Sequence, residues 1–519
     1  LKSIEIGGVL GIAPFVILAV MFLLLPTMFL IGAAFVGPDG SFTFQNILDL
    51  GTPQIVASFW ISIRVSVASA VLGVLVGLFI ALAVIRGRLP SSVRSAAFTF
   101  SGVASQFAGI PLAFAFLSTL GRLGLLTVLL KFVGIDIYRA GFNLLSFWCL
   151  TLTYLFLQIP LMILIIAPAI DGLKREWGEA ASTLGASNWQ FWRYVGLPVR
   201  HAVAALRQRL RRHRNGLCPD RLVAQHRADP PLCADPRRRA AQSRPRRGAG
   251  ARHDRHHGAR QYHLSGRPRP GGTVAQMKTS RLWAWIVFAL GALYFIIPLL
   301  ATFEFSLRIR RDGYTFDAYA SVFSDPKFHQ TFGYSIVVGI CTIVVGILVI
   351  VPAAYYVRLK MPALRPIIEF ISLLPLIIPA IILVYGYIRL YSSSSWLPLT
   401  NSAMGTNILL TLGYVALAMP YMYRAVDTGL RTIDVQTLTE AASILGASQT
   451  TIILRVILPN IVVAVLSGAF LTLAIVIGEF TIASLLNRPA FGPYMQNIGA
   501  NRAYEPAALA AISFLITLA

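Results

Sequence analysis

The stretch EAASILGAS at residues 440–448 repeats the stretch EAASTLGAS at residues 179–187, with eight identities in nine positions. A Leu-Pro pair follows each copy at the same distance, at 197–198 and at 458–459, so both pairs keep the offset of 261 residues. Self-similarity of this quality indicates a chain that is built from two related halves.

Around the two copies the chain is a succession of long apolar runs. Of its 519 residues, 56% are hydrophobic and only 13% are charged, a balance that is rare in a soluble protein of this size. A run of about 20 residues is long enough for a helix to cross a hydrocarbon core about 30 Å thick. We expect ten spans, at about residues 8–36, 57–85, 95–120, 144–170, 283–303, 332–357, 366–391, 405–423, 460–486 and from 504 onward. A backbone in lipid has to satisfy its own hydrogen bonds, and the runs do not alternate strictly between apolar and polar residues. The sequence therefore predicts an all-α, polytopic membrane helical bundle.

Basic residues in short loops predict the orientation of this bundle, because cytoplasmic loops carry an excess of Arg and Lys. Such residues follow the second run of each half, namely Arg86, Arg88 and Arg94, and Arg358, Lys360 and Arg365. Counting spans from these loops places both copies of the repeated stretch on the cytoplasmic side. The same number of spans precedes each copy, so the two halves are parallel repeats.

The residues of the repeated stretch suit a short helix that docks on another protein. Glu179 and Glu440 stand near the helix start, where the helix dipole favours a carboxylate. The two alanines and the serine that follow have small side chains, so the helix can enter a cleft on another protein without steric conflict. Gly185 and Gly446 allow the backbone to turn sharply before a second short helix.

The pattern E-A-A-x-x-x-G, closed by Leu-Pro after a fixed gap, resembles the coupling loop of permease subunits of binding-protein-dependent ABC importers. In that family the loop inserts into a cleft on a cytoplasmic ATPase. The resemblance implies an ATPase-coupling role for Glu179, Ala180, Ala181 and Gly185 in the first half, and for Glu440, Ala441, Ala442 and Gly446 in the second. It also implies three kinds of partner, namely two cytoplasmic ATPase subunits, a periplasmic or extracellular solute-binding protein, and the lipid bilayer. The protein is then a multi-pass protein of the bacterial plasma (inner) membrane.

The sequence shows no residues for catalysis. The chain contains no Gly-Lys pair and therefore no phosphate-binding loop of the G-x-x-x-x-G-K-[ST] type. The four cysteines have no CxxC spacing, so we expect no metal cluster. We expect that this chain is not an enzyme and holds no cofactor, and that ATP is bound and hydrolysed on a partner subunit.

Most of the net charge of +24 lies in one segment, residues 199–276, which holds 19 Arg and 4 Asp. The segment has no Lys, Glu, Ile, Phe, Met or Trp. This composition suggests GC-rich DNA read in a wrong frame, and a shift of one base can turn His253–His257 into Met-Ile-Val-Ile-Met. We predict a frameshift near Val199. The alternative is a linker that binds RNA or anionic lipid, but such linkers usually contain Lys, so we expect no nucleic-acid partner.

The expected organisation has three parts. Residues 1–198 form a first permease half of four spans and a coupling loop, which lacks the last two of nominally six spans. Residues 199–276 are the Arg-rich segment, frameshifted or disordered. Residues 277–519 form a second half of six spans, the last cut by the end of the chain, and Met277 is a candidate start of a separate permease.

Charged residues inside spans are candidates for the transport path, because a charge in lipid is costly. Glu479 is the best candidate for the translocation path, although a position at a helix break near the outer surface also explains it. Arg64 and Glu369 lie nearer to span ends, where we expect them to pair with loop charges or to extend to the interface.

The function expected from the resemblance is a substrate translocation pathway that is coupled to ATP hydrolysis on separate subunits. The second half resembles permeases for polyamines, ferric iron and phosphonates. Two alternatives stay open. One is a secondary transporter without an ATPase, and the other is a membrane-anchored protein that binds nucleic acid through its Arg-rich segment.

Overall fold

The computed structural model describes residues 6–87, 89–104, 109–171, 175–187, 190, 193–194, 281–309 and 313–518. Within these ranges the chain is helical, and its one β-bridge, between Val36 and Phe42, is isolated. The predicted all-α helical bundle is thereby confirmed. The chain divides into two units, residues 1–168 with 279–519, and residues 169–278. The Arg-rich segment and its predicted frameshift lie outside the described residues.

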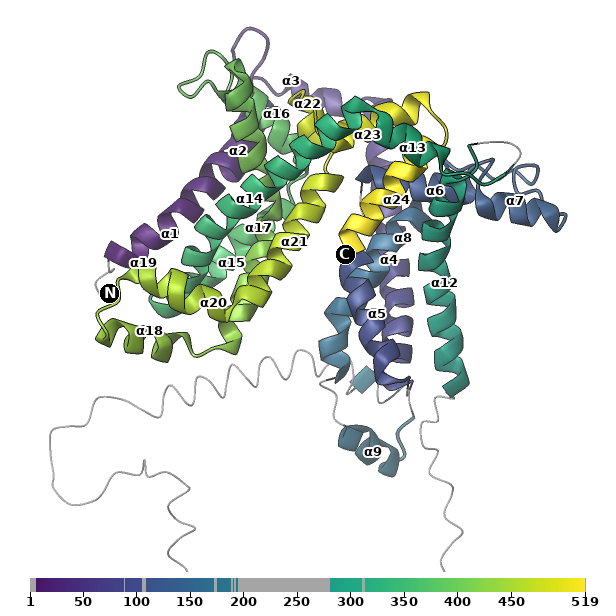
Figure 1. Ribbon diagram of the computed structural model, residues 1–519, viewed down its shortest axis with the longest axis horizontal. Coiled ribbons are helices and arrows are strands. Elements are labelled where there is room, and N and C mark those ends of the chain that lie inside the picture. Colours follow the sequence, from purple (N-terminus) through teal and green to yellow (C-terminus); the bar gives the residue numbers. More distant parts are fainter. Residues whose placement is uncertain are drawn as a thin grey trace, which may run out of the picture. The chain divides into compact units, whose positions relative to one another are not determined.

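The first half contains α1 (Ile6–Ala19), a π-helical turn η1 (Val20–Leu24), α2 (Leu25–Ala33), α3 (Gln45–Leu48), α4 (Pro53–Arg86), α5 (Ser91–Ala104), α6 (Gly109–Leu120), α7 (Leu125–Phe132), α8 (Phe147–Asp171) and α9 (Arg175–Thr183) (Figure 1). The second half begins with α12 (Arg281–Ser306), α13 (Asp317–Ser324), α14 (Pro326–Leu359), α15 (Arg365–Leu373), α16 (Ala380–Leu390) and α17 (Ala403–Thr432). It continues with α18 (Val435–Ile444), α19 (Gln449–Thr451), α20 (Leu458–Asn460), α21 (Val462–Gly478), α22 (Thr481–Leu485), α23 (Phe491–Asn501) and α24 (Glu505–Leu518).

Seven apolar helices of the described chain are long enough to cross a membrane, and two bent pairs raise the number to nine. The seven are Gly8–Ala33, Pro53–Arg86, Gly109–Phe132, Phe147–Pro168, Leu282–Ser306, Pro326–Leu359 and Ala403–Thr432. The bent pairs are Pro362–Leu376 with Ala380–Leu390 and Gln449–Asn460 with Val462–Gly478. The shorter apolar helix α24 comes last.

Three of the expected spans are interrupted. In the run at 460–486, Glu479 is extended between α21 and α22. The run at 95–120 is not one helix, because Gly109 has a φ of +71°, a left-handed conformation that an α-helix does not contain. The run at 366–391 bends by 95° between α15 and α16. Pro375 and Pro379 lie at this bend, and a proline cannot donate the backbone hydrogen bond that would continue the helix.

The two halves repeat each other in backbone geometry as well as in sequence. The amide of Thr43 donates to the carbonyl of Phe35, and the amide of Thr315 donates to the carbonyl of Leu307, both at 2.9 Å. The long helices that follow, α4 and α14, each have 34 residues and each carry a proline in their first turn, where its missing amide costs nothing.

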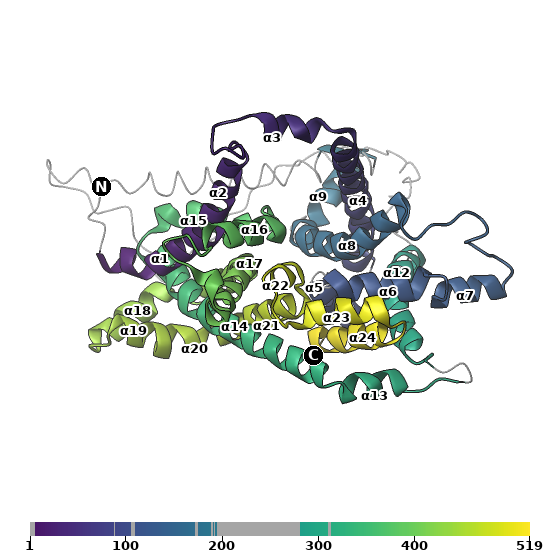
Figure 2. The same cartoon turned by 90° about the horizontal axis from the view of Figure 1, so that it is seen from above.

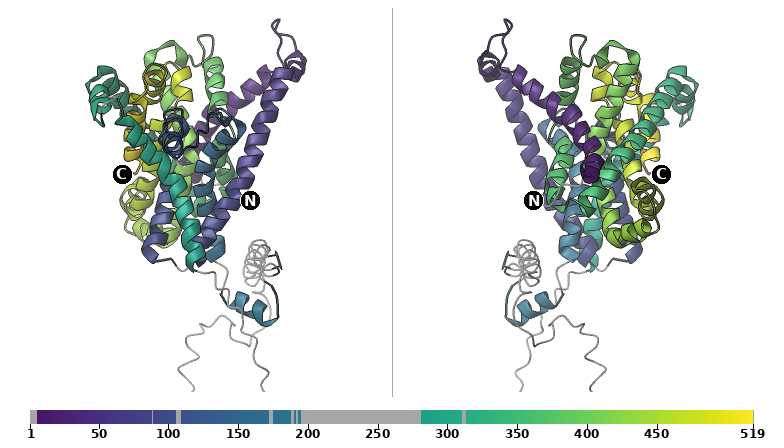
Figure 3. Two further views of the ribbon diagram at one scale, coloured as in Figure 1. Left: turned by 90° about the vertical axis from the view of Figure 1, so that its right-hand side faces the viewer. Right: turned by 90° about the vertical axis from the view of Figure 1, so that its left-hand side faces the viewer.

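Each half packs its first span on the other half. In Figures 1 and 2, α1 lies along α14, and α2 packs on α16. Reciprocally, α12 of the second half packs on α4 and α6 of the first, which Figure 3 shows from two sides. The halves are therefore joined by an exchange of their first helices.

Tyrosine hydroxyls hold the exchanged helices by bonding to backbone carbonyls. Tyr387 of α16 and Tyr391, which directly follows this helix, donate to the carbonyls of Phe22 and Met21, at 2.5 and 2.7 Å. Met21 and Phe22 belong to the π-turn η1, where the regular hydrogen-bond pattern of the α-helix is interrupted. On the other side, Tyr294 of α12 donates to a carbonyl of α8 at 2.5 Å. These carbonyls belong to apolar helices of membrane length, so the bonds satisfy groups that would be costly to leave unpaired in lipid.

The exchange also depends on a close approach at Gly11 of α1. A Cβ at this position would overlap the ring of Tyr356 on α14, and that ring is buried. We predict that Gly11→Ala lowers the free energy of unfolding by about 1–3 kcal/mol, the usual cost of overpacking, with a lower melting temperature in detergent. The control is Gly32→Ala in α2, where a Cβ would meet nothing within 4 Å. An equal effect of the two substitutions would contradict the described packing.

α21 to α24 have no counterpart among the described residues of the first half. On α14, Gly339 faces Leu473 of α21, and Ser335 accepts a hydrogen bond from the amide of Phe491 in α23. Ile63 and Val67, the positions of α4 that lie 272 residues earlier, at the offset that relates Thr43 to Thr315, are exposed. The expectation that the first half lacks its last two spans stays a prediction.

Candidate functional site

The second copy of the repeated stretch forms most of α18, a ten-residue helix that follows α17 after a two-residue link. Asp434 caps its start, because the carboxylate accepts hydrogen bonds from the Thr437 amide at 3.2 Å and from the Thr437 hydroxyl at 2.8 Å. These bonds stabilise the ionised form and hold the pKa of Asp434 below its usual value. The cap therefore stays charged at neutral pH.

One face of α18 packs on the bundle and the other is exposed. Val435, Thr439 and Ala442 are buried, and the Thr439 hydroxyl hydrogen-bonds that of Tyr355 on α14 at 3.1 Å. Glu440 lies on the exposed face. Residues four and seven positions apart share a helix face, which explains this division.

The predicted site residues of the second copy fall on both faces. Glu440 and Ala441 are exposed, as a docking role requires, and Glu440 accepts a hydrogen bond from the side chain of Gln436 at 2.8 Å. Ala442 instead packs inward. The two alanines of the motif therefore face different surroundings, and only Ala441 is available to a partner.

Gly446 ends the helix. Its φ is +81°, which a glycine adopts without steric cost. The amide of Ala447 then bonds back to the carbonyl of Ala442 at 3.0 Å, as in a Schellman cap. This turn leaves Ile444 and Leu445 85% and 86% exposed.

The first copy has the same local geometry in its own unit. Gly185 has a φ of +76°, and the amide of Ala186 bonds back to the carbonyl of Ala181 at 3.0 Å. Glu179 and Ala180 are exposed and Ala181 is half-buried. Leu184, which corresponds to Leu445, is 86% exposed.

Each copy therefore presents an exposed leucine beside a left-handed glycine. These leucines are not among the residues predicted from the sequence, although their place directly before the glycine is visible in the motif. A single exposed leucine is ordinary on a protein surface, so what distinguishes this pair is the equivalent place that both leucines have, directly before the glycine.

Glu479 lies at a helix break, one of the two explanations considered for it. It follows the last residue of α21 in extended conformation, and its carboxylate accepts the amide of Ile482 in α22 at 3.0 Å. The buried phenol of Tyr414 lies beside this carboxylate, and its hydroxyl lacks a well-formed hydrogen bond. A role of Glu479 in the translocation path stays a prediction.

The other two charged residues considered in the spans both have partners. Glu369 accepts a hydrogen bond from Arg365 at 2.7 Å, which confirms the expected pairing. The guanidinium of Arg64 lies over the ring of Phe147, 5.5 Å from its centre.

Comparison with known proteins identifies a family for the second half of the chain. The family described as "Binding-protein-dependent transport system inner membrane component" matches residues 342–519, a range that includes α17, α18 and α21 to α24. This part of the chain belongs to the binding-protein-dependent permease family. The match contains the second copy of the repeated stretch.

Individual relatives support the same family. The chain is 28% identical over 222 residues to the spermidine/putrescine transport system permease protein PotB of Haemophilus influenzae, covering 40% of this chain and 75% of the relative. It is 28% identical over 209 residues to a probable sulfate transport system permease protein, cysT, of Chlorokybus atmophyticus, covering 39% and 70%. A thiamine transport system permease protein, ThiP, of Escherichia coli is 27% identical over 141 residues, covering 27% and 25%.

By this match and these relatives, residues 342–519 belong to the permeases of binding-protein-dependent ABC importers, and these permeases are the proteins that the chain resembles. Together with seven or more apolar helices, this makes the chain a multi-pass protein of the bacterial inner membrane. Permeases of this family form the translocation pathway, and they are transporters rather than enzymes.

The Asp434 cap yields a prediction about the order of α18. Asp434→Ala removes both acceptors, so amide hydrogen exchange in the first turn of α18 should become faster at neutral pH, as measured by mass spectrometry. A carboxyl whose pKa is lowered by folding stabilises the fold only while it is ionised. The difference between variant and wild type should therefore vanish as the pH falls through the lowered pKa.

The control for this experiment is Asp325→Ala. Asp325 caps α14 in the same way, through the amide of Lys327 at 2.9 Å. The Asp325→Ala substitution should leave the amide hydrogen exchange of α18 unchanged at every pH. Equal protection of α18 in wild type and Asp434→Ala at neutral pH would show that the cap does not order this helix.

Proposed function

We propose that the two repeated loops of this permease couple transport to ATP hydrolysis on two cytoplasmic ATPase subunits. The observation that carries the proposal is the doubled local geometry, in which Leu184 and Leu445 each stand exposed before a left-handed glycine. A pair of equivalent docking elements fits a pair of equivalent motor subunits. The membership of the second half in the permease family supports this assignment.

The described contacts give α18 a mechanical connection to the membrane helices. α17 runs without interruption for 30 residues and passes into α18 through Ile433 and Asp434. The hydrogen bond between Thr439 and Tyr355 attaches the same helix to α14. A displacement of α18 by an ATPase subunit would therefore be transmitted to two spans directly.

In the proposed cycle, ATP binding closes the two ATPase subunits and draws the two coupling helices together. The spans then reorient and open the pathway toward the far side, where a solute-binding protein delivers the substrate. ATP acts on the partner subunits, and this chain contributes the docking surfaces and the pathway.

The proposal names the class of importer and leaves the substrate open. The relatives are described as permeases for spermidine and putrescine, for sulfate and for thiamine, which differ in charge and size. Which of these kinds of substrate a permease transports depends on the residues that contact the substrate.

Single substitutions at the exposed leucines test the proposal. We expect Leu445→Asp to reduce co-purification of the ATPase subunits strongly, because a charged carboxylate cannot be buried in an apolar contact. Leu184→Asp should act in the same direction, and so should Glu440→Lys and Gly446→Asp. The measurement is the ratio of ATPase to permease after affinity purification in detergent.

The matched control is Leu48→Asp in α3, where the leucine is 68% exposed but lies in the loop between the first two spans. It should leave the ratio unchanged. A wild-type chain that brings down no ATPase would favour a secondary transporter instead. Salt-sensitive RNA binding would favour the nucleic-acid alternative.

A further inference from the structure

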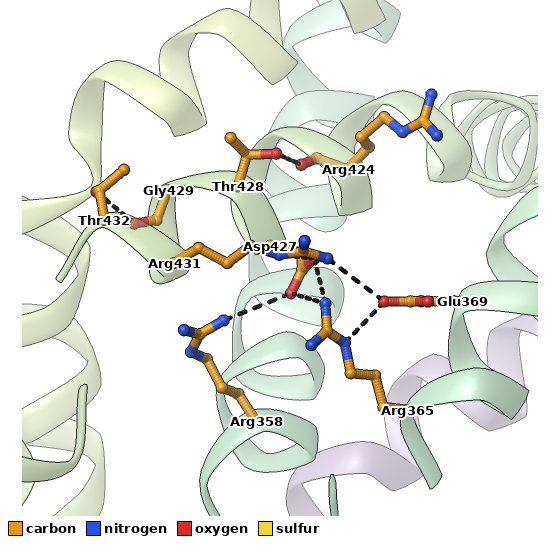
Figure 4. A network of polar contacts seen from close by, with 9 residues as sticks. All are labelled: Arg358, Arg365, Glu369, Arg424, Asp427, Thr428, Gly429, Arg431 and Thr432. Atoms are coloured by element: carbon orange, nitrogen blue, oxygen red, sulfur yellow. Dashed lines mark hydrogen bonds and ion pairs between the residues drawn. The ribbon is translucent and has the colours of Figure 1, made fainter. Parts of the chain in front are cut away.

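Three arginines converge on one carboxylate near the end of α17, that of Asp427 (Figure 4). Arg365 of α15 lies with its Nη2 3.0 Å from Oδ2, and Arg431, one turn further along α17, donates its Nε to the same oxygen at 2.8 Å. Arg358 of α14 lies with its Nη1 3.9 Å from Oδ1. The Asp427 side chain is only 11% exposed.

A second carboxylate, that of Glu369, also belongs to the cluster but contacts fewer of its arginines. Glu369 of α15 is bonded to Arg365 at 2.7 Å and lies 3.6 Å from Arg431, and it is more exposed than Asp427. Asp427 contacts the guanidiniums of all three arginines, whereas Glu369 pairs with those of Arg365 and Arg431. Three positive charges are thus held by two negative ones, and the buried carboxylate is the shared partner.

The cluster joins three elements at the place where α18 begins. Asp427 and Arg431 lie at the end of α17, directly before the link to α18. Tyr355, which bonds to Thr439 of α18, lies three residues before Arg358 on α14. α18 is therefore attached to two of the elements that the cluster connects, and α15 is the third.

α15 depends on such attachments for its position. It has only nine residues, and a helix of this length has little stability of its own. It forms the first part of the span that bends by 95°. The other helix of this span, α16, packs on α2 of the first half. A movement of α15 would therefore be passed through α16 to a helix of the first half.

We propose that Asp427 is a positioning residue that makes α15 move together with α18. The proposal rests on the coupling function proposed above for α18. With Asp427 ionised, α14, α15 and α17 act as one body at the base of the coupling helix. Without its charge, three like-charged guanidiniums share the one remaining, partly exposed carboxylate. Breaking a partly buried ion pair by removing one partner leaves the others uncompensated, and the guanidiniums would separate.

The test is a distance measurement between α15 and α18 in the complete complex. Spin labels are placed at Ile367 of α15 and Gln436 of α18, both of which are exposed. The distance distribution is recorded without nucleotide and after trapping with ATP and vanadate. In the otherwise wild-type complex we expect the same distribution in both states. In Asp427→Asn we expect the distribution to shift or broaden on trapping.

Two further variants separate positioning from general damage. Asp427→Glu keeps the carboxylate and should restore the unchanged distribution. Asp136→Asn is the control, because Asp136 also pairs with an arginine, Arg139 at 3.5 Å, in a loop elsewhere in the chain. It should behave like the wild type. If Asp427→Asn does not assemble, Arg365→Gln removes the link between α15 and Asp427 and should give the same shift.

The outcomes are distinguishable. A distribution that shifts on trapping in the wild type overturns the proposal, and so does an Asp427→Asn complex that matches the wild type in both states. In these cases the ATPase subunits still co-purify, so the coupling function survives. Absence of the ATPase from the wild-type complex overturns both proposals together.

Discussion

The exchange of first helices between the two halves is the interaction on which the rest of the structure depends. The π-turn in the first span disturbs the regular hydrogen bonding of a helix at membrane depth, and hydroxyls of Tyr387 and Tyr391 from the other half bond to its carbonyls. Tyr294 makes the reciprocal bond from the second half to the first. Unsatisfied carbonyls are costly in lipid. The halves are therefore held together by hydrogen bonds from tyrosine hydroxyls to backbone carbonyls as well as by packing.

The joined halves give α18 a rigid base. α18 is fixed to the bundle by three means, namely the chain connection to α17, the bond between Thr439 and Tyr355, and the inward packing of Ala442. Its exposed face and the apolar tip at Leu445 remain free for a partner. A short helix that is rigidly based and exposed at its tip suits the transmission of force, because little of an applied displacement is lost in bending.

The sequence predicted the fold well where composition alone decides it. Apolar runs of membrane length predicted most of the helices and the all-α bundle, whereas the arrangement as two parallel halves stays a prediction. The bend at Pro375 and Pro379 was missed because the run at 366–391 is predominantly apolar on both sides of it, and hydropathy does not register a missing backbone donor. The inward position of Ala442 follows from the rotation of α18 about its axis, which the two identical alanines of the motif do not reveal. The Asp427 cluster was missed for another reason. The expected span ends at residue 423, which leaves Asp427 outside it, whereas α17 continues to Thr432.

The central claim is that two matching loops bind two motor subunits, and photo-crosslinking tests it most directly. A benzophenone amino acid replaces Leu184 in one variant and Leu445 in another, and each is irradiated in native membranes. The account predicts a covalent adduct with an ATPase subunit from each position. Adducts with lipid alone, or an ATPase adduct from only one of the two positions, would contradict it.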